Sequence, residues 1–181
     1  MRVITGSARG EKLEAPEGLS TRPTTDRVKE SVFNIIQTRI PTDNVLDLFA
    51  GSGAMGIEAL SRGSKHAVFI DNDPNAIKII KRNLDGTRLA ERADVINTTA
   101  DSYLKRCREK FNIIFLDPPY NRDFLNIIIT EILSHSILAD DGIIVIESEL
   151  GGEIVSVDGI ECIKNTKYGK TVVSVFKEKT E

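Results

Sequence analysis

The sequence predicts an α/β fold in which helices cover both faces of an open, mostly parallel sheet. Three observations support this prediction. Short apolar runs that suit buried strands alternate with helical segments from residue 45 onward. Glycines or acidic residues follow several of these runs directly, where sheets of this kind bind their ligands. The last two apolar runs flank a tight turn, which indicates an antiparallel last strand.

The length and composition limit the class of protein. The chain has 181 residues, of which 40% are hydrophobic, and this suits a single α/β domain. No apolar run approaches the roughly 20 residues that span a membrane, and no leader pattern opens the chain, so we expect a soluble, cytoplasmic protein. Cys107 and Cys162 are expected to be free thiols. His66 and His135 are isolated, and no metal site is predicted.

The charge distribution gives only limited support to RNA binding. The net charge is −3, from 24 Lys and Arg against 27 Asp and Glu, so bulk charge does not indicate a nucleic-acid partner. Residues 1–40 nevertheless carry more basic than acidic side chains. Within this positive region, Arg9 and Lys12 are candidate RNA contacts, and an ordinary solvated surface is the plainer interpretation.

An N-terminal extension, residues 1–40, is predicted to consist of a hairpin and a helix. Residues 2–6 and 11–15 flank a turn-rich stretch, which indicates a small β-hairpin. Thr24, Thr25 and Asp26 supply capping side chains and a first-turn acid for an amphipathic helix that ends before Pro41. No linker separates this extension from the core, residues 41–181, so a single domain that spans residues 1–181 is expected.

The core elements follow from apolar runs, helix caps and turn residues. Asp73 and Pro74 are the expected N-cap and first residue of one helix, and Asp101 is the expected cap of the next. An Asp-Asp-Gly turn at residues 140–142 should precede a strand, and a Tyr-Gly turn at 168–169 should join the closing pair. The expected strands are 45–48, 67–70, 94–97, 113–116, 143–147, 159–165 and 171–177, and the expected helices are 54–61, 74–84, 101–107 and 123–135.

The stretch FNIIFLDPPY, residues 111–120, is the centre of the predicted site. Pro118 and Pro119 restrict the residue before each of them, so Asp117 and Pro118 should be extended and keep their carbonyls free. A carboxylate, a rim of carbonyls and the ring of Tyr120 suit a planar group that bears an NH2. The structural alternative is a buried strand that ends in a Pro-Pro turn, with Tyr120 as a surface residue.

A second candidate site follows the first strand of the core. Gly51, Gly53 and Gly56 satisfy the GxGxxG pattern, and Asp71 ends the next strand, so a dinucleotide site for NAD is one interpretation. Asp47, directly before the glycines, instead suits a cationic ligand such as an aminoacyl group, and the sequence lacks a His or Lys constellation for hydride transfer. Asp47, Asp71 and Asp101 have structural alternatives as residues that bond loop amides or cap helices.

Four motifs together resemble a known class of enzyme. The pattern DxFAGSG at 47–53, the acid that ends the next strand, Ala100-Asp101 and the DPPY motif resemble class I S-adenosylmethionine methyltransferases that modify exocyclic amines. The stretch RPTTDRVKESVFN, residues 22–34, is similar to the signature of the RsmD family, bacterial enzymes that methylate guanine N2 in 16S rRNA. The resemblance covers essentially the whole chain and implies a Rossmann-like class I methyltransferase fold.

The resemblance also implies a role for each matching residue, with S-adenosyl-L-methionine as the cofactor. The target base would be held by Asp117, Pro118, Pro119 and Tyr120. The cofactor-binding residues would be Asp47, Phe49, Gly51 and Gly53 at the methionine part, Asp71 at the ribose, Asn72 and Asp101 (with the backbone of Ser102 or Ala100) at the adenine, and Arg22 and Thr24 closing over it. The family usually has Glu at the position of Asp71, and the shorter acid can still chelate a ribose.

The implied partner is 16S rRNA within the small ribosomal subunit or its precursor, since 181 residues leave no room for a separate target-recognition domain. Three alternatives remain at this stage. The first is an amino-methyltransferase that acts on DNA adenine or on a protein glutamine, which share the DPPY motif. The second is a cofactor- or RNA-binding module without transfer. The third is the NAD oxidoreductase.

Overall fold

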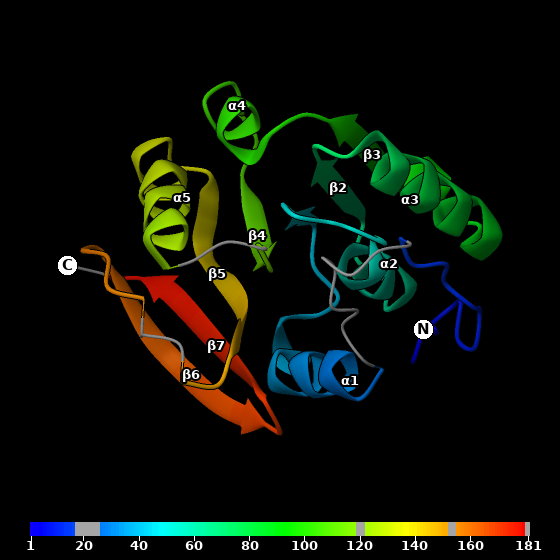
Figure 1. Ribbon diagram of the computed structural model, residues 1–181, viewed down its shortest axis with the longest axis horizontal. Helices are drawn as coiled ribbons and strands as arrows, with labels where there is room; N and C mark the ends of the chain where they lie inside the picture. Colours follow the sequence, from blue (N-terminus) through cyan, green and yellow to red (C-terminus); the bar gives the residue numbers. More distant parts are fainter. Residues whose placement is uncertain (17–25, 119–121, 152–154, 180–181) are drawn as a thin grey trace.

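The computed structural model describes residues 1–16, 26–118, 122–151 and 155–179 (Figure 1). Within these ranges a seven-stranded sheet has the order β3-β2-β1-β4-β5-β7-β6. β1 to β5 are parallel, and β7 is antiparallel to both β5 and β6, so the predicted mostly parallel sheet with an antiparallel closing pair is confirmed. The strands are β1 Asn44–Asp47, β2 His66–Asp71, β3 Ala93–Asn97, β4 Phe111–Leu116, β5 Leu138–Glu149, β6 Ile160–Tyr168 and β7 Thr171–Glu178.

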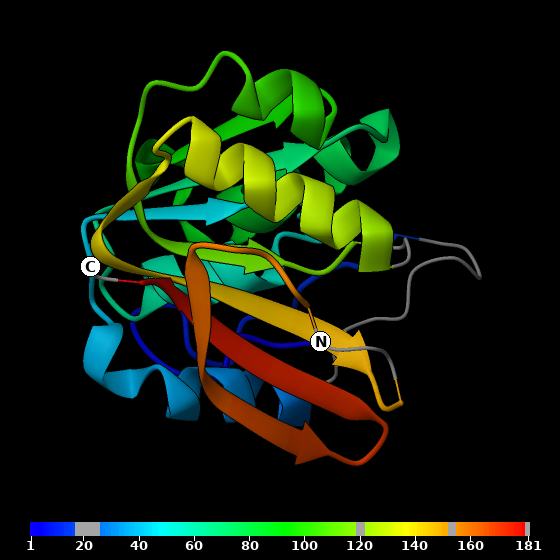
Figure 2. The ribbon, with the colours of Figure 1, turned by 90° about the vertical axis from the view of Figure 1, so that its left-hand side faces the viewer.

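Helices cover both faces of the sheet, and Figure 2 shows α1 and α5 on opposite sides of it. The helices are α1 Asp26–Ile35, α2 Ala54–Ser61, α3 Pro74–Thr87, α4 Ala100–Leu104 and α5 Arg122–Ser134, with 3-10 turns η1 Gln37–Arg39 and η2 Ala90–Arg92. Asp73 caps α3 by accepting a hydrogen bond from the Asn75 amide at 2.8 Å, with Pro74 as the first helical residue, as predicted. None of the helices in the described ranges is long and apolar enough to cross a membrane.

Strand periodicity divides the core into two layers. Successive residues of a strand point to opposite faces, so Ile113 and Phe115 of β4 pack with α1, α2 and α3. Ile114 and Leu116 pack on the other face with α4 and α5. β4 is therefore buried on both faces, as its continuous apolar run predicts.

The N-terminal arm, residues 1–16, pairs with itself and packs on α2. Arg2 and Lys12 form an antiparallel bridge, and the Leu13 amide donates to the Met1 carbonyl at 2.9 Å, so the predicted hairpin is present as a short ladder. Gly6 has a left-handed φ of +91°, and a Cβ there would lie 1.8 Å from the Ser61 carbonyl oxygen. Only glycine allows this close approach to the end of α2.

Two local predictions are wrong. Thr99, and not Asp101, caps α4 through a hydrogen bond from the Ser102 amide to Oγ1 (3.2 Å), and the helix ends at Leu104 instead of Cys107. Asp101 is already helical, and its carboxylate pairs with Lys105 one turn later. The Asp-Asp-Gly stretch does not precede its strand but lies within β5, where Asp141 has φ +59° and the pairing with β4 shifts. Pairing on both sides of the irregularity keeps it in the strand.

Candidate active site

Three predicted acids end neighbouring strands at one edge of the sheet. Asp47 is aligned with Phe69 of β2 and with Phe115 of β4. Asp71 and Asp117 each lie two residues beyond these partners along the chain. Because β1, β2 and β4 are parallel, Asp71 and Asp117 flank the chain that leaves β1. The structure therefore brings together acids that are 24 to 70 positions apart in the sequence.

The glycine loop, residues 48–53, is attached to both neighbouring strands. The Leu48 amide donates to the Phe115 carbonyl at 3.2 Å, and the Ala50 amide donates to the Ile70 carbonyl at 3.0 Å. Gly51 is left-handed with φ +54°, and a Cβ on it would meet none of the described residues within 4 Å. Among these residues the backbone at Gly51 thus borders open space, where a ligand can approach it directly.

Asp47 is a buried acid beneath this loop, with 4% of its surface exposed. Its carboxylate accepts a hydrogen bond from the Gly56 amide at 3.1 Å, which is the contact that the structural alternative requires. Burial nevertheless raises the pKa of Asp47 to about 7; the Gly56 bond opposes the rise and the charge of Asp71 adds to it. A cation beside the carboxylate would favour its ionised form, so the site suits a positively charged ligand group.

Asp71 connects the end of β2 to the glycine loop. One carboxylate oxygen accepts from the Gly51 amide at 2.9 Å, and the other accepts from the Asp73 amide at 2.9 Å. Each oxygen keeps a second lone pair, so two hydroxyl groups could still donate to this carboxylate. Asn72, beside it, is exposed.

Asp101 lies on the first turn of α4 with an exposed carboxylate, 2.8 Å from the Lys105 ammonium group. This pair raises the pKa of Lys105. The resemblance placed the backbone of Ser102 or Ala100 beside the adenine, together with Asp101. The Ser102 amide already donates to Thr99 as part of the helix cap. The expected adenine contact therefore depends on the Asp101 side chain or on the backbone of Ala100.

Asp117 is exposed at the end of β4, and Pro118 after it is half-buried. The carboxylate is not turned into the interior, which a role toward a substrate requires. Pro119 and Tyr120, together with Arg22 and Thr24, lie outside the described residues, and their roles stay predictions.

Two aromatic rings join the glycine loop to α5. Phe49 is half-buried, and its ring centroid lies 5.8 Å from that of Phe124 at an interplanar angle of 63°. Such an edge-on pair stabilises its geometry by about 0.5–1.5 kcal/mol beyond burial. Phe124, in the first turn of α5, was not predicted as part of this region. Its only signal in the sequence was an aromatic residue four positions after the DPPY motif, near the start of a predicted helix.

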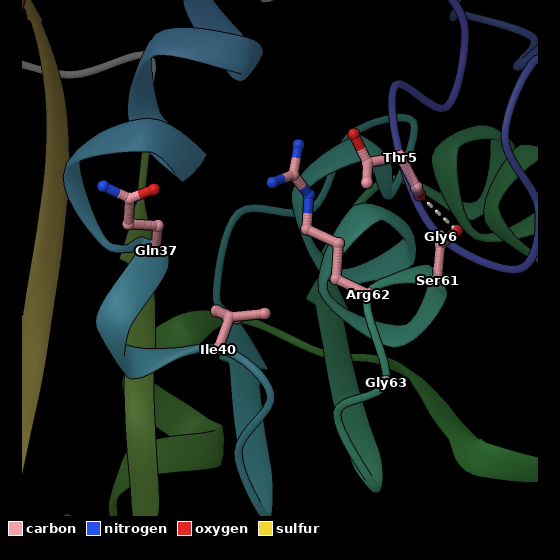
Figure 3. A pocket seen from close by; sticks show the side chains of 7 residues that line it. All are labelled: Thr5, Gly6, Gln37, Ile40, Ser61, Arg62 and Gly63. Atoms are coloured by element: carbon pink, nitrogen blue, oxygen red, sulfur yellow. Dashed lines mark hydrogen bonds between the residues drawn. The ribbon is translucent and has the colours of Figure 1, made fainter.

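Arg9 and Lys12 are exposed on the N-terminal arm. The arm also borders a hollow of about 360 Å³ (Figure 3), in which the Arg62 side chain extends toward Thr5. Its lining residues are Thr5, Gly6, Gln37, Ile40, Ser61, Arg62 and Gly63. The hollow lies at the C-terminal end of α2, whereas the glycine loop precedes its N-terminus, so it is separate from the candidate active site.

Solved structures of other proteins share this architecture. A protein from Escherichia coli, yhhF, provisionally described as a methyltransferase, has a TM-score of 0.89 at 33% identity, covering 100% of this chain and 99% of that one. The Haemophilus influenzae protein HI0767, provisionally described as a methylase, has a TM-score of 0.80 at 30% identity, covering 98% and 97%. The sheet order and these neighbours define a Rossmann-like class I methyltransferase fold.

Sequence comparisons narrow the class to one family. The family described as Conserved hypothetical protein 95 matches residues 1–177. YlbH of Bacillus subtilis, provisionally named an rRNA methyltransferase, is 43% identical over 183 residues, covering 99% of this chain and 100% of YlbH. Ribosomal RNA small subunit methyltransferase D of Escherichia coli K12 is 41% identical over 150 residues, covering 83% and 75%. The chain belongs to this family, the RsmD family, as the motifs predict.

Proposed function

We propose that the protein transfers a methyl group from S-adenosyl-L-methionine to the exocyclic N2 of a guanine in small-subunit (16S) rRNA. The observation that carries the proposal is the alignment of strand ends that sets Asp71 and Asp117 on either side of the glycine loop. One acid is then available to the cofactor and the other to the acceptor. The names of the E. coli and B. subtilis relatives support rRNA as the substrate class.

The residues of the glycine loop fit this cofactor. The open space beside Gly51 admits a ligand to the backbone, and the buried Asp47 is suited to a ligand ammonium group. Asp71 retains lone pairs for the two hydroxyls of a ribose. The proposed cofactor residues are Asp47, Phe49, Gly51, Gly53, Asp71, Asn72 and Asp101, together with Arg22 and Thr24 by family resemblance.

S-adenosyl-L-methionine supplies an electrophilic methyl group when it is bound. The guanine N2 lone pair is delocalised into the ring, so the amine is a poor nucleophile by itself. Its two hydrogens would donate to the Asp117 carboxylate and the Pro118 carbonyl, which favours a more tetrahedral nitrogen. As the new carbon–nitrogen bond forms, Asp117 would stabilise the positive charge that develops on the nitrogen. The surplus proton leaves the nitrogen for solvent afterwards, so the site needs no strong base.

Positioning would supply much of the remaining rate enhancement. Pro119 would keep the backbone after Asp117 extended, and Tyr120 would stack on the base. Such stacking is worth about 1–3 kcal/mol, which offsets the few kcal/mol needed to unstack a base from its RNA.

The family resemblance implies recognition of an assembled particle, and a small chain with a net charge of −3 is compatible with such a partner. The proposed partner is therefore 16S rRNA in the small subunit or its precursor. Arg9 and Lys12 are the proposed contacts to this RNA, because both are exposed on the arm.

One experiment separates this function from its alternatives. Undermodified small subunits, naked 16S rRNA and DNA are incubated in parallel with the protein and radiolabelled S-adenosyl-L-methionine, and the labelled nucleoside is identified. We expect N2-methylguanosine from the subunits. Label in DNA adenine or in protein would assign a different substrate. Cofactor binding without any transfer would indicate a binding module, and binding of NAD instead would indicate an oxidoreductase.

A further inference from the structure

We propose that Asn83 is a positioning residue that fixes the glycine loop against the N-terminal arm and thereby sets the affinity for the cofactor. The inference rests on the proposed function, and it assigns a role to a side chain that is not among the cofactor or acceptor residues proposed above. Asn83 lies on α3, and only 3% of its surface is exposed.

Three short hydrogen bonds connect Asn83 to two other segments. Its Oδ1 accepts from the Glu14 amide at 2.8 Å. Its Nδ2 donates to the Glu14 carbonyl at 2.9 Å and to the Ser52 carbonyl at 2.9 Å. Ser52 lies between the two left-handed glycines of the loop, and Glu14 lies near the end of the arm. One buried amide therefore joins α3, the arm and the glycine loop.

The chemistry of this position specifies an amide. The three partners require one acceptor and two donors from the same short side chain, which asparagine provides. Aspartate would keep the acceptor for the Glu14 amide, but it would lose both donors and place an acceptor against two carbonyls. A buried polar group that loses its hydrogen-bond partner destabilises the folded state, so the arrangement is selective for asparagine over an isosteric acid.

The Ser52 contact completes the support of the glycine loop. Asp71 holds the loop through the Gly51 amide, and Asn83 holds it through the Ser52 carbonyl on the next residue. Flanking glycines give this backbone wide conformational freedom, so each anchor reduces the number of loop conformations. A loop held in its binding conformation before the ligand arrives binds more tightly, because less ordering accompanies binding.

The arm is the second component of this arrangement. Both backbone groups of Glu14 bond to Asn83, and its carboxylate lies 3.1 Å from the Arg82 guanidinium group. Ordering of the loop on binding should therefore also order the arm at Glu14, since both share one side chain. Coupling of this kind is reciprocal.

The test compares variants of α3 in the full chain. Asn83→Ala and Asn83→Asp remove the contact to Ser52. Thr87→Val is the matched control, because the Thr87 hydroxyl is also buried but bonds only to the Asn83 and Leu84 carbonyls of its own helix. Affinity for S-adenosyl-L-methionine is measured by calorimetry at a temperature where each variant is folded, and steady-state kinetics give the KM for the cofactor and kcat.

We expect at least 10-fold weaker binding and a matching rise in KM for the Asn83 variants, with kcat at saturating cofactor within threefold of wild type. Thr87→Val should bind within twofold of wild type even where its Tm falls equally. Wild-type affinity in the Asn83 variants, or an equal loss in Thr87→Val, would overturn the inference while leaving the proposed function intact. Failure of the wild-type protein to bind the cofactor would overturn both.

A measurement on the wild-type protein keeps the inference testable if the variants do not fold. The Glu14 amide has Asn83 Oδ1 as its acceptor, so its hydrogen exchange reports on this bond. Saturation with S-adenosyl-L-methionine should slow this exchange at least 10-fold. An unchanged rate at Glu14, with slower exchange at Gly51, would show that the arm is not coupled to the loop.

Discussion

The ammonium group of Lys29 lies 3.2 Å from the carboxylate of Glu58, and neither side chain is exposed to solvent (0% for both). Glu58 also accepts from Arg62 Nε at 2.9 Å and from the amides of Ile4 and Thr5 at 2.8 and 3.0 Å. Burial lowers the pKa of Lys29, and Glu58 opposes that change. This buried pair joins α1, α2 and the N-terminal arm, so it stabilises the extension that precedes the core.

Removal of the Lys29 charge should strongly destabilise the protein. Lys29→Met leaves the buried Glu58 without one of its partners, and breaking a buried pair in this way reduces the free energy of unfolding by about 3–5 kcal/mol. Urea unfolding at pH 7 measures the change. The control is Lys65→Met, because the Lys65–Asp43 pair is 78% and 71% exposed and should contribute under about 1 kcal/mol. Equal effects of both substitutions would contradict a structural role for the buried pair.

Asp47→Asn should stabilise the cofactor-free protein at high pH and weaken cofactor binding. The folded pKa of Asp47, about 7, exceeds its ordinary value of 3.8, so its contribution to stability is fully present below about pH 4. That contribution is lost as the pH rises through 7. The asparagine variant keeps an acceptor for the Gly56 amide and does not ionise, so we expect it to be more stable than wild type by about 2–4 kcal/mol at pH 8.

The difference between Asp47→Asn and wild type should shrink steadily as the pH falls from 8 to 4, as measured by thermal or urea unfolding without cofactor. Asp43→Asn is the control for the loss of an exposed carboxylate, since the Asp43 side chain is 71% exposed. A pH-independent difference for Asp47→Asn would show that the pKa of Asp47 is not raised and that its carboxylate is ionised and compensated in the folded protein.

Asp117 and Asp71 should affect different steps of the proposed reaction. Asp117→Ala should lower the single-turnover rate of methyl transfer by about 10²–10³-fold, because it would remove the charge that we propose stabilises the transition state. Its cofactor affinity should stay near that of wild type. Asp71→Ala also removes the acceptor for the Gly51 and Asp73 amides, so it should weaken cofactor binding. An equal loss of cofactor affinity in both variants would contradict this division of roles.

Two helical glycines should respond to the same substitution with opposite signs. A Cβ on Gly56 of α2 would lie 2.3 Å from Cε1 of the buried Phe69, whereas a Cβ on Gly86 of α3 would meet nothing within 4 Å. Gly56→Ala should therefore reduce stability by about 1–3 kcal/mol through overpacking. Gly86→Ala should raise it by about 0.4–1 kcal/mol, because alanine restricts the unfolded chain. Thermal unfolding of the two variants checks both signs.

Reversal of charge on the arm should weaken transfer to RNA. Arg9→Glu combined with Lys12→Glu replaces two exposed cations, so we expect a lower kcat/KM for small subunits and a weaker dependence on salt, with cofactor affinity unchanged. Lys167→Glu, at an exposed position of β6, is the control for net charge. Unchanged methylation in the double variant would exclude Arg9 and Lys12 as RNA contacts.

Local patterns in the sequence were sufficient to predict most of the fold and the position of the candidate site. The start of α3 at Asp73 and Pro74 depends on neighbouring residues only, as does the sharp turn at Gly51. The acids at the ends of β1, β2 and β4 could be placed together because parallel strands end at a common edge. The cap of α4 was wrong because Thr99 and Asp101 are both suitable capping residues, and only the backbone conformation distinguishes them.

The contacts that join distant segments were decided by the tertiary structure alone. The sequence around Asn83 predicts only a polar residue in a helix. In the structure its side chain forms hydrogen bonds with the backbone of Glu14, 69 positions away. Lys29 and Glu58 likewise read as surface charges of two amphipathic helices, and their burial follows from the packing of the arm across α2. Periodicity and helix capping act over a few residues. A buried polar contact depends on which distant segments of the chain pack together, and local sequence patterns do not determine that packing.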